Sequence, residues 1–438
     1  MDTEAHPVVF TTKTPYSLPS QKFMIPLDWS RYQLSQLINK ALSLPKPIPF
    51  DFLIHGEILR TTLEKWRAEK GIGEEETLEI EYFESVLPPQ RMSALPHEDW
   101  VSSVSCRISQ HILTASYDGH VRLFDYSHNC IRDIPAHPAP IPSIAVVSCS
   151  QANDDSLTIA SASHDLTAHL TKISLATDAP VPFQTLASLH LHTYPLSSIT
   201  ADATGSTLLT ASGDCLIGVW DSTIPSEDEV ALESGDRKKR RKVGTQPVRK
   251  APSTVLKSHT ARVSKVLFAP NSRQHAHSCG FDSTVRHWDV EMGVCMNTLT
   301  APERPMLDLA LTSDGNVALA ASTDRTVSVF DLRGSDLSCT IGTLTHPATP
   351  SCLVCSDASN ASQVMTGSYD GVARLWDLRS MQSAVTSFRV WEGMKILDVD
   401  WAGDTLCVGG EGGVEIWRVS QGERISAAAL EKPTNADN

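Results

Sequence analysis

Apolar and polar residues alternate along most of this chain, and the alternation predicts short β-strands joined by tight turns. The stretches LTASYDGHVRLFD, at 113–125, and VMTGSYDGVARLWD, at 364–377, each contain two such strands on either side of an Asp-Gly step. Alternation that flanks a turn of this composition is typical of a β-hairpin. The pattern therefore predicts a mainly β fold for this part of the chain.

One spacing recurs through the chain: an acidic residue, usually in a Ser-x-Asp setting, is followed six positions later by an aromatic residue. The pairs are Asp118/Phe124, Asp214/Trp220, Asp282/Trp288, Asp324/Phe330, Asp370/Trp376 and Glu411/Trp417. Asp165 begins a further copy, in which Thr171 takes the aromatic position. Successive acidic positions are 47, 49, 68, 42, 46 and 41 residues apart. A period of this length with seven units predicts a closed ring of small sheets, which leaves few exposed strand edges.

The period and the ending of each unit resemble the WD-repeat family over about three quarters of the chain. The Trp-Asp ending occurs at Trp220-Asp221, Trp288-Asp289 and Trp376-Asp377, with Phe124-Asp125 and Phe330-Asp331 as close variants. The resemblance implies a seven-bladed WD-repeat β-propeller, in which the turn aspartate accepts hydrogen bonds from the turn backbone and from an upstream histidine. The upstream places hold His97, His137, His192, His259 and His346. The fifth unit (APERPM) and the seventh (Met394-Lys395) lack this histidine, so packing should matter more there.

The same side chains are also the types needed for nucleophilic catalysis, for example His192, Ser212 and Asp214. An enzyme needs one such group in one cleft, whereas five or more copies at a fixed period suit a repeated structural network. We therefore expect no enzymatic activity. The expected structural residues are His97, Asp118, Asp165, His192, Asp214, His259, Asp282, Asp324, His346 and Asp370.

The predicted propeller occupies residues 97–430, followed by a disordered tail at 431–438. Residues 87–96 form a linker or the strand that closes the ring. Two segments could close it: Arg91 to Leu95, ahead of the first unit, or Arg424 to Leu430 at the end.

The 68-residue interval contains a charged insertion at 222–254. An acidic half with Glu227, Asp228 and Glu229 leads into six consecutive cations, which cannot be buried together. These cations are Arg237, Lys238, Lys239, Arg240, Arg241 and Lys242. A run of this kind favours a nuclear-import signal. Contact with RNA is a second interpretation, and a solvated loop without a binding role is the third.

Residues 1–86 lack the repeat spacing and predict a separate small α+β domain with the order β-β-α-β-β-α-β. Strands are expected at Val8 to Lys13, Phe23 to Pro26, around the His55-Gly56 turn and at Thr77 to Tyr82, with a short helix at Leu63 to Lys70. A longer helix, capped by Asp28 or Ser30, should present Leu34, Leu37, Ile38, Ala41 and Leu42 on one face.

The stretches FDFLIHGEIL and GIGEEETLEIEY resemble the ubiquitin-like fold, and the chain continues without a terminal Gly-Gly, so a docking module is expected. A ubiquitin-like domain of the NLE type followed by seven WD repeats resembles the family of WD-repeat protein 12, called Ytm in fungi. The resemblance implies a nuclear factor of the nucleolus and nucleoplasm that serves large-subunit (60S) ribosome assembly and rRNA maturation. The implied partners are pre-60S particles, a WD-repeat scaffold of the Erb/BOP family, a pescadillo/Nop-type factor and the AAA ATPase midasin.

The resemblance also implies that a loop glutamate of the small domain completes a magnesium ion held by midasin, since Mg²⁺ takes six oxygen ligands. The chain itself then needs no cofactor. Glu75 matches the family position best, with Glu74 and Glu76 as neighbours that the sequence leaves open; the plain reading is a solvated acidic turn. A different class of function, a substrate adaptor of a ubiquitin ligase or proteasome, would also combine these two domain types.

Bulk properties agree with this picture. The chain of 438 residues suits a small domain plus a repeat array, and its net charge of −14 argues against a general nucleic-acid surface. No apolar run approaches a membrane span, and the segment MDTEAHPVVF lacks a signal-peptide pattern, so we expect an intracellular protein. The ten cysteines do not have the spacing of a disulfide framework. Cys352 and Cys355 form a CxxC motif, but a zinc site would need a second pair of ligands, so we expect both to pack in the core.

Overall fold

The computed structural model describes residues 5–19, 21–44, 47–71, 73, 77–85, 89–108, 110–150, 156–175, 181–230, 247–300, 304–333, 340–356 and 362–419. Its contacts divide the chain into two units at Gln90/Arg91. The first contains the small N-terminal domain, and the second, Arg91–Trp417, contains seven sheets of the propeller. Neither helix in the described part of the chain is long and apolar enough to cross a membrane.

The N-terminal domain has the element order that the sequence predicted. Its elements are β1 (Ala5–Thr11), β2 (Lys22–Pro26), α1 (Arg31–Leu42), β3 (Phe50–Ile54), β4 (Glu57–Ile58), α2 (Leu63–Lys70) and β5 (Leu78–Glu84). They form one sheet in the order β2-β1-β5-β3-β4. The central pair β1 and β5 runs parallel, with Val8 beside Leu78, and the other pairs are antiparallel. This is the mixed sheet of a ubiquitin-like fold.

Ser30 is the N-cap residue of α1, and its backbone N–H donates to Gln33 Oε1 at 3.0 Å, a capping-box contact. Leu34 and Ile38 are buried in the core between helix and sheet, where Leu37 and Leu42 pack at the margin. Ala41 is exposed, so the predicted apolar face is one residue too wide. The helix ends one residue later, at Leu42, and Ser43 takes a left-handed backbone conformation (φ 51°).

The first four sheets of the propeller follow one another in the chain. Their strands are β7 (Val101–Ile108), β8 (His111–Ser116), β9 (His120–Asp125) and β10 (Cys130–Pro135); β11 (Ser143–Ser150), β12 (Ser156–Ala162), β13 (Thr167–Ser174), β14 (Phe183–His190) and β18 (Val248–Lys250); β15 (Leu196–Ala201), β16 (Thr207–Ser212), β17 (Leu216–Asp221) and β19 (Thr254–Lys257); and β20 (Val263–Ala269), β21 (Ser272–Gly280), β22 (Thr284–Asp289) and β23 (Val294–Thr300).

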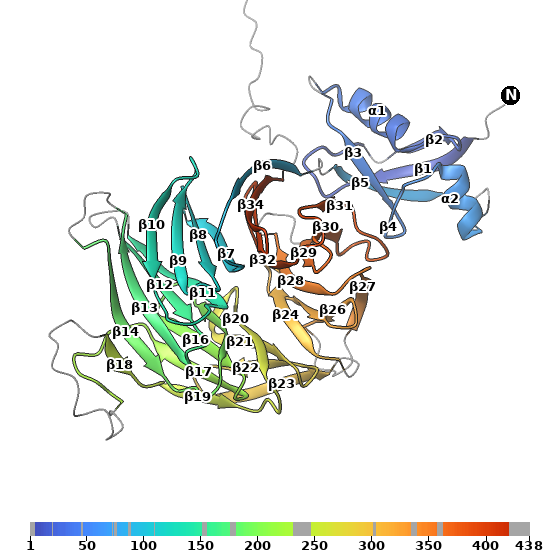
Figure 1. Ribbon diagram of the computed structural model, residues 1–438. Coiled ribbons are helices and arrows are strands. Elements are labelled where there is room, and N and C mark those ends of the chain that lie inside the picture. Colours follow the sequence, from blue (N-terminus) through green and yellow to red (C-terminus); the bar gives the residue numbers. More distant parts are fainter. Residues whose placement is uncertain are drawn as a thin grey trace, which may run out of the picture. The chain divides into compact units, whose positions relative to one another are not determined.

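Three further sheets complete the propeller. Their strands are β24 (Met306–Leu311), β25 (Val317–Ser322), β26 (Thr326–Asp331) and β27 (Thr340–Thr345); β28 (Pro350–Cys355), β29 (Gln363–Ser368), β30 (Val372–Asp377) and β31 (Thr386–Arg389); and β32 (Ile396–Ala402), β33 (Thr405–Gly410), β34 (Gly413–Arg418) and β6 (Gln90–Leu95). Figure 1 shows the seven sheets in chain order around a common centre.

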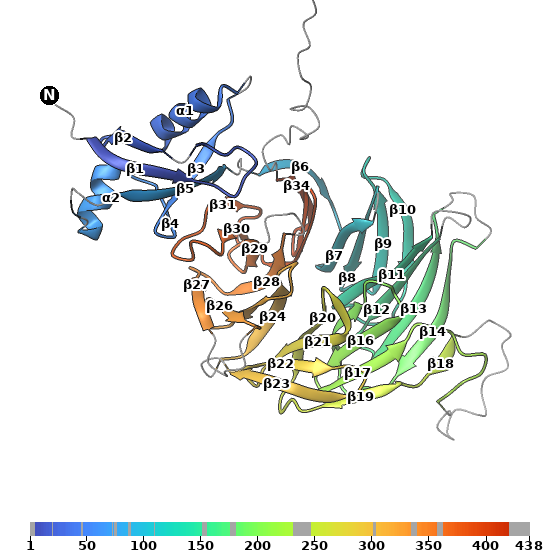
Figure 2. The same ribbon diagram turned by 180° about the vertical axis from the view of Figure 1, so that it is seen from behind.

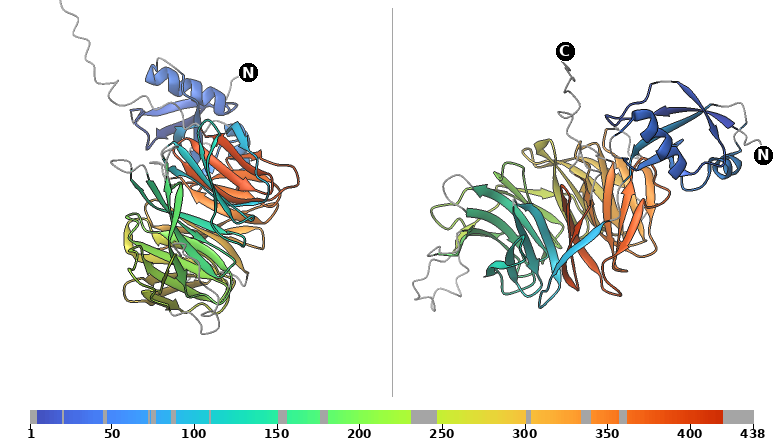
Figure 3. Two further views of the ribbon diagram at one scale, coloured as in Figure 1. Left: turned by 60° about the vertical axis from the view of Figure 1, so that its left-hand side comes forward. Right: turned by 90° about the horizontal axis from the view of Figure 1, so that it is seen from above.

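The seventh sheet combines both ends of the repeat array. Strand β6 forms its outer edge beside β34, as both face views show (Figures 1 and 2). Of the two segments considered from sequence, the one ahead of the first repeat therefore takes this place; Arg424 to Leu430 lies outside the described residues. Arg91 Nη2 in β6 lies 2.7 Å from the buried carboxylate of Glu415 in β34. The first and last sheets are also adjacent in the side views of Figure 3.

The charged insertion contains a strand that the sequence pattern did not predict. β18 pairs in parallel with β14, so it adds a fifth strand to the second sheet although it lies between two strands of the third. Asp228 and Glu229 hold its backbone: Arg249 N–H donates to Asp228 at 2.8 Å and Ala251 N–H to Glu229 at 2.9 Å. Part of the predicted acidic half is thus an ordered base of the insertion.

Apolar cores lie between neighbouring sheets, and the repeat aromatic residues Phe124, Trp220, Trp288, Phe330 and Trp376 pack into them. Trp220 in the third sheet packs with Leu170 and Ala187 of the second, and Trp288 in the fourth packs with Leu209 and Val219 of the third. Truncation of such a buried aromatic residue costs about 3–5 kcal/mol of stability. Strands such as β8 and β29 are buried at almost every position, because neighbouring sheets cover both of their faces.

Candidate functional site

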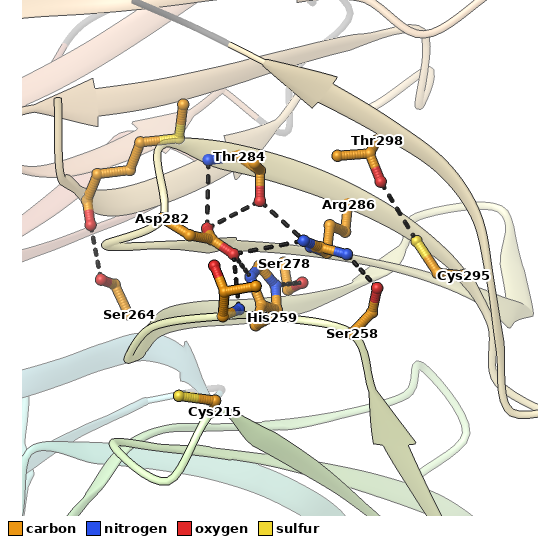
Figure 4. Close-up of polar contacts among 12 residues, drawn as sticks. Cys215, Ser258, His259, Ser264, Ser278, Asp282, Thr284, Arg286, Cys295 and Thr298 are labelled. Atoms are coloured by element: carbon orange, nitrogen blue, oxygen red, sulfur yellow. Dashed lines mark hydrogen bonds and ion pairs between the residues drawn. The ribbon is translucent and has the colours of Figure 1, made fainter. Parts of the chain in front are cut away.

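The turn between β21 and β22 shows the repeated polar network most fully (Figure 4). Asp282 accepts hydrogen bonds from His259 Nδ1 at 2.8 Å, Thr284 Oγ1 at 2.8 Å and the Thr260 backbone N–H at 3.2 Å. The other ring nitrogen of His259 lies 2.7 Å from Ser278 Oγ, which also accepts from Trp288 Nε1 at 2.8 Å. A single chain of hydrogen bonds therefore links the turn, the loop before the sheet and the buried tryptophan.

Charge and burial explain why the pKa of Asp282 is held well below its ordinary value. Burial alone would raise the pKa, but the hydrogen bond and charge of His259 and the hydrogen bonds from Thr284 and Thr260 outweigh it. Asp165 in the second sheet has a pKa of about 2 for the same reason, with His137 at 2.9 Å. These carboxylates are ionised acceptors whose donors are all supplied by the fold, which leaves them no reacting partner.

In the third sheet a histidine again links the turn aspartate to a hydroxyl group, but the hydroxyl belongs to Thr210 and not to Ser212. His192 Nδ1 lies 3.0 Å from Asp214, and its Nε2 lies 2.8 Å from Thr210 Oγ1. Ser212, considered above as a nucleophile, instead donates to the backbone carbonyl of Tyr194 at 2.8 Å. His192, Ser212 and Asp214 therefore do not assemble into a catalytic triad, because the hydroxyl that contacts the His192 imidazole belongs to Thr210 and not to Ser212.

In the first and sixth sheets the geometry departs from the expected pattern. His97 Nδ1 hydrogen-bonds the Leu95 carbonyl at 3.0 Å rather than Asp118, and Arg122 Nη2 takes the carboxylate at 2.7 Å. The sixth sheet repeats this substitution: His346 contacts the Leu344 carbonyl, and Arg374 binds Asp370 at 2.6 Å. A guanidinium is always charged and offers several donors, so it is the stronger partner for a carboxylate.

Two sheets lack the histidine, as the sequence indicated. Asp324 in the fifth sheet is exposed. Among the described residues it accepts only from Thr326, through its backbone N–H at 3.1 Å and its hydroxyl at 2.6 Å. Glu411 in the seventh accepts from the Lys395 backbone N–H at 3.1 Å, with the Lys395 ammonium 3.5 Å away.

Sequence reasoning missed a ring of polar contacts between the inner strands of successive sheets. Hydroxyl groups donate across to carbonyls of the next sheet, Ser197 to Val263 at 2.5 Å and Ser264 to Met306 at 2.6 Å among them. Ser102 and Ser351 make the equivalent contacts to Ile141 and Ile396. A signal existed: each of these serines is the second residue of its inner strand, directly after an apolar residue or proline.

Carboxylates of the inner strands also join neighbouring sheets, as Asp308 does by accepting from Leu353 N–H at 2.7 Å. Asp398 accepts from Val104 N–H and Asp400 from Cys106 N–H, both at 2.9 Å, which joins the seventh sheet to the first. Burial raises the pKa of Asp398. Asp398 and Asp400 line part of a cavity of about 900 Å³ in the channel, together with Lys265. Backbone N–H groups already occupy the carboxylates of Asp398 and Asp400, so we assign these residues a structural role in the wall of the cavity.

The CxxC pair lies in strand β28. Cys352 and Cys355 are both buried, and Cys355 belongs to the apolar core of the fifth and sixth sheets. Burial raises the pKa of the Cys352 thiol well above its ordinary value, so it remains a thiol. The described residues contain no group of three His, Cys, Asp or Glu side chains placed to hold a metal ion.

The remaining candidate residues lie outside the described part of the chain. These are Glu74, Glu75 and Glu76 and the cations Arg237, Lys238, Lys239, Arg240, Arg241 and Lys242. The residues that flank the glutamates are described: α2 ends at Gly71 in the left-handed region, and Lys22 Nζ donates to Thr77 Oγ1 at 3.3 Å. His6 Nε2 lies 3.4 Å from the Gly73 carbonyl. Both ends of the acidic stretch therefore contact the β1–β2 hairpin.

Comparison with known proteins matches both domains. The NLE (NUC135) domain model matches residues 7–66, and the WD domain, G-beta repeat model matches 90–125, 183–221, 250–289, 293–331 and 338–377. The ribosome biogenesis protein YTM1 of Laccaria bicolor is 59% identical over 435 residues, which cover 96% of each chain. This chain belongs to the YTM1 family. The YTM1 proteins of Coprinopsis cinerea and Saccharomyces cerevisiae are 52% and 34% identical, over 98% and 86% of this chain and 98% and 88% of theirs.

Membership in the YTM1 family confirms the resemblance drawn from the repeat spacing and the small domain. The matched repeats leave out β11–β13 of the second sheet and β32–β34 of the seventh sheet of the YTM1 propeller. Those two sheets are the ones with the least regular motifs, Thr171 in place of the aromatic residue and Glu411 in place of aspartate.

Proposed function

We propose that this protein is a non-catalytic scaffold in the biogenesis of the large (60S) ribosomal subunit, with a role in rRNA maturation. The observation that carries the proposal is the near full-length identity of 59% to a ribosome biogenesis protein YTM1. The repeated His–Asp networks support it, because every charged member is engaged by donors or acceptors of the fold. The protein acts in the nucleolus and nucleoplasm.

The propeller is the part that holds other assembly factors. Its partners are a WD-repeat scaffold of the Erb/BOP family and, in the same complex, a pescadillo/Nop-type factor on pre-60S particles; contact with rRNA is indirect. Affinity purification of the tagged full chain and of a chain that lacks residues 1–89 tests this division. Both should recover the scaffold factors, and only the full chain should recover the ATPase. Recovery of cullin or proteasome subunits instead would favour the alternative function, a substrate adaptor.

The N-terminal domain docks on the AAA ATPase midasin through Glu75. A carboxylate from this loop would complete the six oxygen ligands of a Mg²⁺ ion that belongs to midasin, and the chain itself holds no metal. The contacts at Gly73 and Thr77 support the proposal, because they hold both ends of the acidic stretch against the β1–β2 hairpin.

Substitution of single glutamates tests this docking. Glu75→Ala should abolish Mg²⁺-dependent binding of midasin, whereas Glu79→Ala, which removes the same charge from an exposed position on β5, should leave binding unchanged. Circular dichroism and recovery of the scaffold complex should be normal for both variants. Loss of binding in Glu74→Ala or Glu76→Ala alone would move the role to that neighbour, and binding retained in all three would refute the docking.

The six cations of the insertion direct nuclear import. Replacement of Arg237, Lys238, Lys239, Arg240, Arg241 and Lys242 by glutamine in a fluorescent fusion should shift the protein to the cytoplasm, and an appended import signal should restore it. Unchanged nuclear accumulation would contradict this role.

A further inference from the structure

One end of the propeller carries an unusual set of exposed side chains. Consecutive strands of each sheet are antiparallel, so the turns that contain Asp118, Asp165, Asp214, Asp282, Asp324 and Asp370 all lie at the same end as the loops that connect one sheet to the next. We call this end the Asp-turn face.

Aromatic residues gather on the Asp-turn face. Within the described propeller, the exposed aromatic side chains are Trp100, Tyr126, Tyr194, Phe281 and Tyr369, with 40–60% of their surface accessible. Four of these five lie in turns or loops of this face, and only Tyr126 lies at the opposite end, between β9 and β10. Exposed aromatic residues concentrated at one end of a domain are typical of an interaction surface where they form a contiguous group.

Contacts between these side chains form a continuous arc over four successive sheets. Lys395 Nζ lies 5.5 Å from the Tyr369 ring centroid and 5.7 Å from that of Trp100. Trp100 packs against Tyr117 with centroids 5.9 Å apart, and Tyr117 against His164 at 6.2 Å. The arc therefore runs from the sixth sheet through the seventh and first to the second.

Arginine residues on the fourth and fifth sheets complete the charge pattern. The Arg262 guanidinium lies 5.6 Å from the centroid of the Phe281 ring. Its charge also acts on the neighbouring residues of the arc: burial, and then Arg262, lower the pKa of His164, and Arg262 opposes the rise that burial causes in the pKa of Tyr117. Arg262, Arg304 and Arg325 are exposed and form no ion pair with any residue that the structure describes. Arg262, an exposed cation beside an aromatic ring, is therefore complementary to a carboxylate of a partner.

We propose that the arc Tyr369, Lys395, Trp100, Tyr117 and His164, together with Arg262, is the docking surface for an extended acidic segment of a partner protein. Apolar side chains of the segment pack on the rings, and a carboxylate pairs with Arg262. Aromatic residues and arginine are the types that dominate binding energy at protein interfaces. The proposal names the surface used by the proposed scaffold and rests on that function.

A protein segment fits this surface better than a nucleic acid does. Single-stranded RNA also stacks on aromatic rings, but it needs a continuous cationic track for its phosphates. Acidic side chains interrupt the cations here: Glu98 and Asp99 precede Trp100, and Glu411 pairs with Lys395. Phosphates would be repelled at both places, whereas a segment with spaced carboxylates would not.

Site-specific photocrosslinking in fungal cells tests the proposal with the full chain. p-Benzoylphenylalanine replaces Phe281 or Tyr194 on the Asp-turn face, and Tyr126 at the opposite end as control. The expected result is a crosslink from the first two positions to a partner peptide rich in aspartate and glutamate, identified by mass spectrometry and resistant to ribonuclease, with at least tenfold lower yield from Tyr126.

A pair of charge reversals tests the role of Arg262. Arg262→Glu should lower the crosslink yield at least tenfold, and Arg273→Glu, the same change at an exposed site of the opposite end, should not. Both variants should keep the wild-type unfolding midpoint. Crosslinks to RNA, to a second copy of this chain, equally from Tyr126, undiminished by Arg262→Glu, or none at all would overturn the proposal. An acidic segment from a protein unrelated to ribosome assembly would support the docking surface and refute the scaffold function.

Discussion

Two aspartates at equivalent turn positions differ sharply in surroundings, and their removal should differ accordingly. Asp282 is 4% exposed and accepts from His259, Thr260, Thr284 and, at 3.5 Å, Arg286. Its truncation leaves the fully buried His259 and the guanidinium of Arg286 without their carboxylate. Breaking a buried pair in this way costs about 3–5 kcal/mol. Asp324 is exposed, and Thr326 is its one donor among the residues that the structure describes, so its loss should cost about 1 kcal/mol or less.

Equilibrium urea unfolding and thermal unfolding of Asp282→Ala and Asp324→Ala measure this difference. Unfolding entropy is about 2.1 cal/mol/K per residue, so a propeller of roughly 330 residues has about 0.7 kcal/mol/K. A loss of about 3–5 kcal/mol then corresponds to a melting temperature lower by about 4–7 °C for Asp282→Ala, against about 1 °C for Asp324→Ala.

Hydrogen exchange should locate the effect in the fourth sheet, since the network joins its turn to the buried Trp288. Equal destabilisation by the two variants would refute the reasoning, because it would mean that the histidine and the burial add nothing to the turn. A larger effect of Asp324→Ala would do so more strongly.

Three further changes test other parts of the fold. Burial, and then the neighbouring imidazoles, lower the pKa of His277 from 6.5 to about 3. The unfolded chain therefore binds a proton at this residue before the folded chain does, and the free energy of unfolding should fall as the pH drops from 6.5 towards 3. Urea unfolding of His277→Leu should show a fall that is smaller by a few kcal/mol, about 3–5 at most. Asp398→Ala, which orphans a backbone N–H at the ring closure, should cost about 1–3 kcal/mol by the same assay, and the exposed Asp404→Ala nothing measurable. Deletion of residues 1–89 should leave a monomeric propeller by light scattering, whereas deletion of 1–95 removes β6 and should cause association through the open edge of β34.

Local patterns were sufficient for most of the fold. The alternation at 113–125 and 364–377 predicted the hairpins β8–β9 and β29–β30, because side chains of a strand point to opposite faces in turn and an Asp-Gly step favours a tight turn. The N-terminal order of strands and helices followed from the capping residue Ser30 and the helical spacing of Leu34 and Ile38. These features depend on neighbours in sequence, which a single chain reveals.

Pairing between distant segments could not be predicted in the same way. Strand β18 is three residues long, Val-Arg-Lys, without alternation that distinguishes it from a loop. It forms because Lys250 Nζ donates to the Asp221 carbonyl at 2.5 Å and because Asp228 and Glu229 bind the adjacent backbone. Those partners lie more than twenty residues away, and no local propensity encodes them.

Either a histidine or an arginine binds the turn aspartate, and the side chains around the arginine explain which of the two does so in each sheet. Three sheets carry arginine four residues after the aspartate, and in two of them, at Arg122 and Arg374, it takes the carboxylate. In the fourth sheet Arg286 lies 3.5 Å from the carboxylate and donates to Ser258, directly before the histidine, so His259 keeps the closer contact.

The first and sixth sheets have Pro96 and Thr345 in the place of Ser258. There the guanidinium groups of Arg122 and Arg374 donate instead to Ser116 and Ser368 and to the turn aspartates. Ser258→Ala should therefore release Arg286 towards Asp282 and displace the ring of His259 from it. Nitrogen-resolved NMR of the histidine tautomers would detect the change, since Nδ1 would lose its carboxylate partner. A His259 spectrum identical to that of the wild type would show that the serine does not decide the competition and that the backbone of the turn does.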